Sequence, residues 1–145
     1  MPPDTPFIRL KLKLNGLDVL LPADAVRRVL AKSEITHIPG SASWLLGYVQ
    51  TSQSFVPLVD PSQLLKQGEG TVQQWVELEP EMGWPHWCLA VAGSERLKLD
   101  DTPTRTAART ALCAYGYQMG DGQIDELDPE AFIQIPEVVS AMRIA

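Results

Sequence analysis

Two segments of the chain repeat the same order of residue types, and this echo constrains the fold more than any other feature. Residues 47–60 and 116–128 each begin with a Gly-Tyr pair that opens an extended run, pass through a polar turn and return as a second apolar run. An Asp-Pro pair follows, its Asp 13 positions after Gly47 and 12 positions after Gly116. Because a hairpin followed by a capped helical turn gives this order, the echo predicts two similar β-units in one small protein.

The clearest predicted strand lies near the N-terminus, where apolar residues at 8, 10, 12 and 14 alternate with basic residues at 9, 11 and 13. A period of two places the apolar groups on one sheet face. Asn15-Gly16 suits a tight hairpin turn, so residues 17–21 should return antiparallel. Apolar runs bounded by turn residues predict further strands over 44–49, 55–59, 75–78, 87–92, 112–119 and 124–127, the last two forming a hairpin around Gly120-Asp121-Gly122.

Few helices are expected. Val26, Val29 and Leu30 follow helical spacing, which predicts a helix of about two turns over residues 23–31. Asp60 is placed to cap a short helix with Pro61 at its first position, and Gln63 completes a pattern like a capping box. Pro57 lacks a backbone donor, so the strand 55–59 should lie at a sheet edge or carry a bulge. The fold class is therefore all-β with short helices, and propensity does not choose between a sandwich and barrels.

Length and composition indicate one domain over residues 1–145, with residues 1–6 as a flexible tail. A chain of 145 residues with 45% hydrophobic residues can bury a core. Neither an export signal nor a long apolar segment is evident, so a cytoplasmic location and reduced thiols at Cys88 and Cys113 are expected. The net charge of −6 disfavours nucleic acid and anionic membranes as partners.

Catalytic motifs are sparse, and the sequence predicts neither an enzyme nor a cofactor site. The only histidines are His37 and His86. His86 and Cys88 would need His37 or Cys113 to complete a zinc site, and simple packing of these residues is the favoured interpretation. Among the four tryptophans, Trp75 and Trp87 are expected in the core, whereas Trp44 and Trp84 suit either core packing or partner binding.

Residues 16–65 carry a more specific pattern. It contains Leu21-Pro22, an Ile38-Pro39-Gly40 turn, Trp44-Leu45 before Gly47, Val56-Pro57-Leu58-Val59-Asp60, and Leu64-Leu65. In this order the chain resembles the CheW-like domain of bacterial chemotaxis coupling proteins. The resemblance extends loosely over nearly the whole chain and is most specific between Gly16 and Leu65.

The resemblance implies two five-stranded, SH3-like β-barrel subdomains packed side by side within residues 7–145. It also implies a non-enzymatic adaptor that bridges the regulatory domain of a CheA-like histidine kinase to the tip of methyl-accepting chemotaxis receptors. Contacts in such proteins come from the barrel ends and the groove between the barrels. The expected partner-binding residues are Trp44, Tyr48, Gln50, Ser52, Gln53, Pro57, Asp60 and Trp84.

One departure from the family pattern falls in the turn after Tyr48. The family usually has Asn-Leu-Arg-Gly there, whereas this chain has Gln50-Thr51-Ser52-Gln53, with Ser52 at the arginine position. The resemblance implies that this arginine helps to hold both receptor and kinase contacts. A serine hydroxyl does not replace its donor fork, so these contacts, and with them the standard receptor coupling, are expected to be altered. The leading hypothesis is a divergent chemotaxis adaptor, monomeric in isolation. The alternative is a barrel-fold binding module for another protein, a peptide or a small ligand outside chemotaxis.

Overall fold

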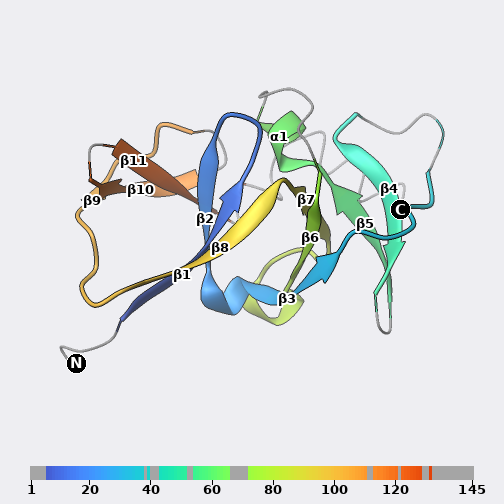
Figure 1. The fold of residues 1–145 in the computed structure, drawn as a ribbon, viewed down its shortest axis with the longest axis horizontal. Coiled ribbons are helices and arrows are strands. Elements are labelled where there is room, and N and C mark those ends of the chain that lie inside the picture. Colours follow the sequence, from blue (N-terminus) through green and yellow to red (C-terminus); the bar gives the residue numbers. More distant parts are fainter. Residues whose placement is uncertain are drawn as a thin grey trace.

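Strands dominate the computed structural model, which describes residues 6–37, 39, 43–51, 54–65, 72–110, 113–120, 122–128 and 131. Two sheets lie side by side along the long axis of the molecule (Figure 1). The six-stranded sheet has the order β8 (Gly93–Leu99), β1 (Phe7–Lys13), β2 (Asp18–Pro22), β11 (Gly122–Leu127), β10 (Cys113–Met119) and β9 (Arg105–Thr106). The five-stranded sheet has the order β3 (Val26–Ala31), β6 (Gln74–Leu78), β7 (Cys88–Val91), β5 (Phe55–Val59) and β4 (Leu45–Gln50).

The two sheets are interlocked through the chain. Hairpin β1–β2 continues into β3, which pairs with β6 of the other sheet. Hairpin β6–β7 likewise continues into β8, which pairs with β1 of the first sheet. Each central hairpin is then joined by a parallel contact to a second hairpin, β2 to β11 and β7 to β5. Each sheet therefore contains strands from both halves of the sequence.

The echo in the sequence corresponds to two equivalent hairpins, as predicted. β4 and β5 pair antiparallel with a register shift between Leu45 and Gly47, and β10 and β11 pair with a shift between Cys113 and Tyr115. The first hairpin leads into α1 (Pro61–Leu64), where the Asp60 side chain accepts a hydrogen bond from Ser62 N at 3.0 Å. The predicted cap at Asp60 is confirmed. The equivalent Asp-Pro pair of the second hairpin, Asp128-Pro129, is followed by residues outside the described part of the chain.

The predicted helix over residues 23–31 is wrong. The segment forms a single 3-10 turn, η1 (Ala23–Ala25), and then the edge strand β3. β3 alternates half-buried and exposed residues and pairs with β6 across a bulge between Val26 and Arg28. Helical spacing over so short a segment does not outweigh the hydrogen bonds that a neighbouring strand supplies.

Three other expectations need correction. The strand orders are open, so the sheets are SH3-like but not closed barrels, and one has six strands through the two-residue β9. Residues 93–99, for which no strand was predicted, form β8. Pro57 lies in an interior strand, β5, yet the parallel contact with β7 pairs only Leu58 and Val59. Pro57 therefore needs no donor toward β7.

The main core lies between the sheets. It includes Trp44, Trp84 and Trp87, with the Trp44 and Trp87 ring centroids 6.2 Å apart. A second cluster around Trp75 fills the interior of the five-stranded sheet, and a third around Tyr117 fills the interior of the six-stranded sheet. The aromatic residues thus unite the two sheets into one packed unit. Over the described ranges, no helix is long and apolar enough to span a membrane.

Candidate partner-binding surfaces

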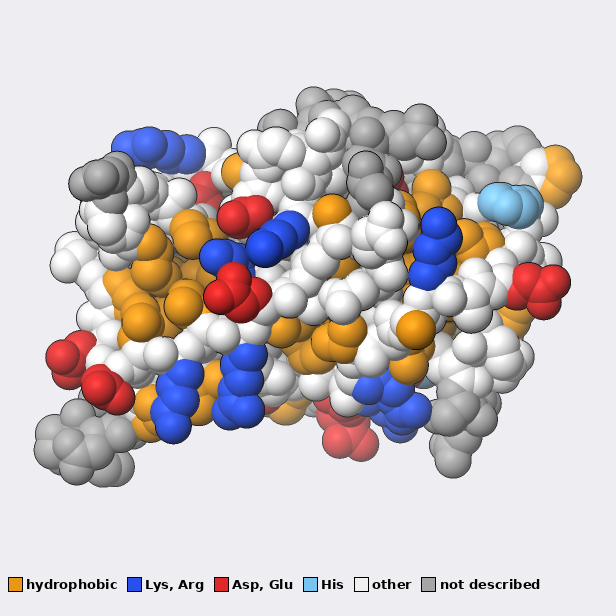
Figure 2. All heavy atoms as spheres, viewed as in Figure 1, with side chains coloured by type: hydrophobic (Ala, Val, Ile, Leu, Met, Phe, Trp, Pro, Cys, Tyr) orange, Lys and Arg blue, Asp and Glu red, His pale blue; other side chains and the backbone are white. Residues whose placement is uncertain are grey.

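A hollow opens where the two sheets meet. Its volume is about 230 Å³, and its lining is Ile8, Arg9, Leu10, Ala23, Val26 and Arg96. β3 and β8, which contribute Val26 and Arg96, are the edge strands of their respective sheets. Figure 2 shows hydrophobic side chains between basic ones in the middle of this face. A concave apolar surface bordered by positive charge suits a partner that carries apolar and acidic groups. We call this surface the inter-sheet hollow.

The Arg9 guanidinium is held in a fixed position beside the inter-sheet hollow. Its Nε forms an ion pair with Glu126, and its Cζ lies 4.2 Å from the centroid of the Phe7 ring. Burial would lower the pKa of Arg9, but the hydrogen bond and charge of Glu126 and the contact with Tyr117 raise it. Arg9 therefore stays charged. Arg96, by contrast, is exposed on β8.

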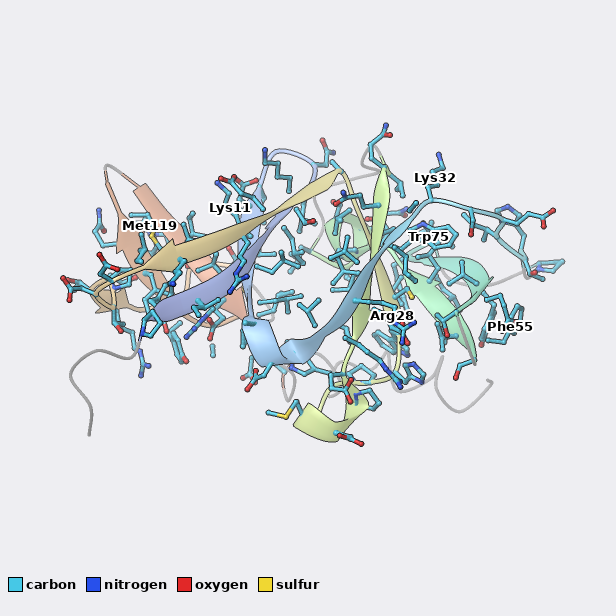
Figure 3. The ribbon with its side chains drawn as sticks, turned by 60° about the horizontal axis from the view of Figure 1, so that its bottom comes forward. Lys11, Arg28, Lys32, Phe55, Trp75 and Met119 are labelled. Atoms are coloured by element: carbon cyan, nitrogen blue, oxygen red, sulfur yellow. The ribbon has the colours of Figure 1, made fainter. Side chains whose placement is uncertain are left out.

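A second surface is the outer face of the β4–β5 hairpin, and we call it the hairpin face. Tyr48 lies opposite Pro57, and Gln50 lies opposite Phe55. Because alternate residues share a face, these four side chains point away from Val49, Val56 and Leu58, which are buried. Tyr48 and Phe55 stack with centroids 5.4 Å apart and an interplanar angle of 16°. Phe55 is 54% exposed and projects from the end of the molecule (Figure 3).

The predicted partner-binding residues separate into distinct environments. Tyr48, Gln50 and Pro57 come together on the hairpin face. Trp44 and Trp84 are only 6% and 5% exposed, and both belong to the core between the sheets. Asp60 is 2% exposed and also accepts a hydrogen bond from the Gln63 amide at 3.0 Å. Ser52 and Gln53 lie outside the described residues.

Phe55 was not among the predicted residues, although its signal was present in the sequence. In a strand of alternating orientation, buried Val56 and Leu58 require Phe55 and Pro57 to point outward. The six-stranded sheet carries a comparable group of partly buried apolar side chains, which includes Leu97, Leu99, Tyr115, Met119 and Ile124. Figure 2 shows apolar side chains gathered on the left of the face in view. Residues 93–99 were not recognised as a strand, so Arg96 could not be placed beside the hollow from the sequence.

A buried acidic group, Glu77, organises charges on β3 and β6. It is 1% exposed, with Arg28 Nε 3.1 Å from Oε1 and His86 Nε2 2.8 Å from Oε2. Its neighbour Cys88 has its pKa raised to about 12 by burial and by the charge of Glu77. Among the described residues, no group of three or more His, Cys, Asp and Glu side chains is arranged to hold a metal ion. The ring nitrogen of His86 that faces Glu77 instead lies within hydrogen-bonding distance of its carboxylate.

Comparisons with known proteins confirm the resemblance to the CheW-like domain. The model of that family matches residues 10–77, which contain most of β1, the elements from β2 to α1 and most of β6. Among solved structures, the chain is similar to the scaffolding protein TtCheW from Thermoanaerobacter tengcongensis, with a TM-score of 0.74 and 15% identity over 92% of this chain and 96% of that chain. No curated protein matches the sequence significantly. The chain thus combines a CheW-like sequence pattern in its first half with the fold of a CheW scaffolding protein throughout.

Proposed function

We propose that this protein is a cytoplasmic, non-enzymatic adaptor that couples chemotaxis-type receptors to a histidine kinase through protein contacts. The observation that carries the proposal is the CheW-like pattern over residues 10–77 on a fold similar to that of a scaffolding protein. Scaffolding needs complementary surfaces rather than activated groups. The inter-sheet hollow and the hairpin face supply two such surfaces on one rigid core.

The inter-sheet hollow is the surface that we assign to the receptor. An amphipathic helix presents apolar anchors at i, i+3 and i+4 to a groove, and a helical receptor segment would fit the hollow in this way. Ile8, Leu10 and Val26 provide the apolar floor, and Arg96 provides an exposed charge at the rim. A positive charge at the rim favours an acidic partner, and reversing it would set like charges against each other, which costs binding free energy.

The hairpin face and the turn beyond it are the surface that we assign to the kinase regulatory domain. Ser52 stands in this turn where the family has arginine, so the chain lacks the guanidinium that usually supports these contacts. Tyr48, Phe55 and Pro57 retain an apolar contact surface next to it. We therefore expect the kinase contact of this protein to depend on aromatic packing more than on a charge-assisted hydrogen bond.

Two titrations test the proposal. The full-length protein is titrated by calorimetry with the regulatory domain of its own kinase and with the tip of its own receptor. Arg96→Glu should weaken receptor binding at least tenfold and leave kinase binding unchanged, because it reverses the charge at the inter-sheet hollow. Lys98→Glu is the matched control, since it makes the same charge change two residues along β8 outside the hollow. Ser52→Arg should strengthen kinase binding.

Each possible result of these titrations distinguishes the adaptor function from an alternative. Binding to neither protein would reject the adaptor function in favour of a binding module outside chemotaxis. Equal losses from Arg96→Glu and Lys98→Glu would show that general charge, and not the hollow, governs receptor binding. Kinase binding that appears only after Ser52→Arg would mean that the fold persists without the usual coupling role.

A further inference from the structure

The hairpin face has the features of a binding surface for a polyproline II segment. Phe55 is more exposed than Val29 and Met82, the other large apolar residues that stand out from the described surface. Its ring is already fixed by stacking on Tyr48 and needs no rearrangement to receive a ligand. Proline-rich segments bind to aromatic-lined surfaces of this kind because their extended helix is preformed and loses little entropy.

The chain itself contains a segment of matching chemistry. Residues 2–6 read Pro-Pro-Asp-Thr-Pro, so Pro3 and Pro6 form a PxxP pattern directly before β1. A polyproline II helix has three residues per turn and a rise of about 3.1 Å per residue, which places Pro3 and Pro6 on one side about 9 Å apart. Along the hairpin face, Phe55 and Pro57 are separated by about 7 Å of strand, so the two spacings are comparable.

The proline segment and the hairpin face of one copy do not meet. β1 begins at one end of the long axis, and β4 and β5 lie at the other end (Figure 1). Six residues extend at most about 20 Å. The segment would use all of this length to run back along β1, and it would then still have to cross the five-stranded sheet to reach the hairpin face. The occupant from this chain must therefore come from a second copy.

We propose that the proline segment of one copy, residues 2–6, docks on the hairpin face of the next, so that the protein associates head to tail at high local concentration. The contact is heterologous: each copy offers a different surface at each end, and the chain of copies stays open unless the rotation closes a ring. The contact is small and therefore weak, which leaves the protein monomeric when dilute. It goes beyond the proposed coupling function because it concerns copies of this chain alone.

Sedimentation velocity over a concentration series tests this proposal on the full chain. The weight-average sedimentation coefficient of the natural protein should rise with concentration. Phe55→Ser and the double variant Pro3→Ala/Pro6→Ala should each lose this rise, with the association constant at least tenfold weaker. Met82→Ser is the control because it removes another exposed apolar side chain, in η2 (Pro80–Met82), away from the hairpin face. It should associate like the natural protein.

A mixture of the Phe55→Ser protein with the Pro3→Ala/Pro6→Ala protein is the most direct test of head-to-tail docking. Phe55→Ser retains an intact proline segment, and the proline variant retains an intact hairpin face, so the mixture should form dimers that grow no further. A natural protein that stays monomeric up to millimolar concentration would overturn the proposal, as would a mixture that remains monomeric.

In a parallel NMR titration, a peptide of residues 1–7 should shift the amide signals of β4 and β5. If only an unrelated PxxP peptide does so, the face serves another protein, and self-docking is rejected. No kinase or receptor is present, so the result is independent of the coupling function.

Discussion

Buried acidic side chains in this protein are held by hydrogen bonds and ion pairs, and sequence alone did not reveal their partners. Asp125 lies on β11, 4% exposed, and accepts hydrogen bonds from Arg109 N at 2.7 Å, Thr110 N at 2.6 Å and the Gln123 amide at 2.7 Å. Two adjacent acidic residues, Asp125 and Glu126, are ordinarily expected in contact with solvent. The structure buries both, since β11 lies between β2 and β10.

Asp125 makes the free energy of unfolding depend on pH. Burial would raise the pKa of its carboxyl, but the hydrogen bonds from Gln123, Thr110 and Arg109 outweigh burial and lower it. The folded state thus binds this proton less tightly than the unfolded chain does. The resulting stability is present above the ordinary aspartate pKa of about 3.9 and is lost as the pH falls through the lower pKa of the folded state.

We expect Asp125→Asn to reduce the free energy of unfolding at pH 7 and to flatten its decline between about pH 5 and pH 2. Urea unfolding at several pH values measures both effects. Asp100→Asn is the control because Asp100 is exposed beyond β8. An Asp125→Asn profile parallel to that of the natural protein would contradict the assignment.

The two thiols should be nearly inert in the folded protein. Burial is the main cause that raises the pKa of Cys88 and of Cys113, each to about 12, and nearby carboxylates add to it. The reactive thiolate is therefore scarce at pH 8. We expect modification by a disulfide reagent to be at least a hundredfold slower than in urea-unfolded protein. Rapid modification of either cysteine without denaturant would contradict this expectation.

At the scale of elements, the pairing of strands decided between helix and strand where the local sequence pattern allowed both. Residues 26–31 have helical spacing of apolar groups, yet they form β3 because β6 offers an open edge along most of their length. The β4–β5 hairpin was predicted correctly because its two apolar runs, its polar turn and the Asp60 cap agree with one another. β8 escaped prediction because its partner, β1, lies some 85 residues earlier in the sequence.

Gly47 allows the first hairpin to approach the backbone at Thr36 closely, and its replacement tests this contact. Its φ is +150°, and a Cβ there would overlap the Thr36 carbonyl, which accepts a hydrogen bond from Tyr48 N at 2.8 Å. Gly47→Ala should therefore destabilise the protein by about 2 kcal/mol or more. Gly122→Ala, where a Cβ meets open space, is the matched control and should change stability by less than about 1 kcal/mol. Chemical denaturation measures both, and equal effects would contradict the close-approach explanation.

At the scale of the whole molecule, the exchange of β3 and β8 makes the sheets dependent on each other. The first half of the chain supplies two strands of the six-stranded sheet, and the second half supplies the remaining four. The five-stranded sheet is divided in a similar way. Neither half can therefore complete a sheet alone, and the tryptophan-rich core between the sheets forms only when both are present.

We expect residues 1–65 and 66–145, produced separately, to lack a cooperative unfolding transition. Mixed together, they should form a 1:1 complex with the circular dichroism spectrum of the intact protein, because the strand exchange buries apolar surface only in the complex. Circular dichroism during urea titration checks this. A fragment that unfolds cooperatively by itself would show that one sheet is stable alone and would contradict the interlocked arrangement.

The sequence by itself determined the local units: the first strand and its Asn15-Gly16 turn, the two hairpins of the echo, and the cap at Asp60. These depend on the period of side-chain orientation, on turn residues and on short-range hydrogen bonds, all of which act within about a dozen residues. Only the tertiary structure decided that residues 26–31 are a strand, that β8 completes the sheet begun by β1, and that Trp44 and Trp84 are both buried. These outcomes depend on partners distant in sequence, whose hydrogen bonds and burial outweigh local preference and cannot be deduced from local spacing alone.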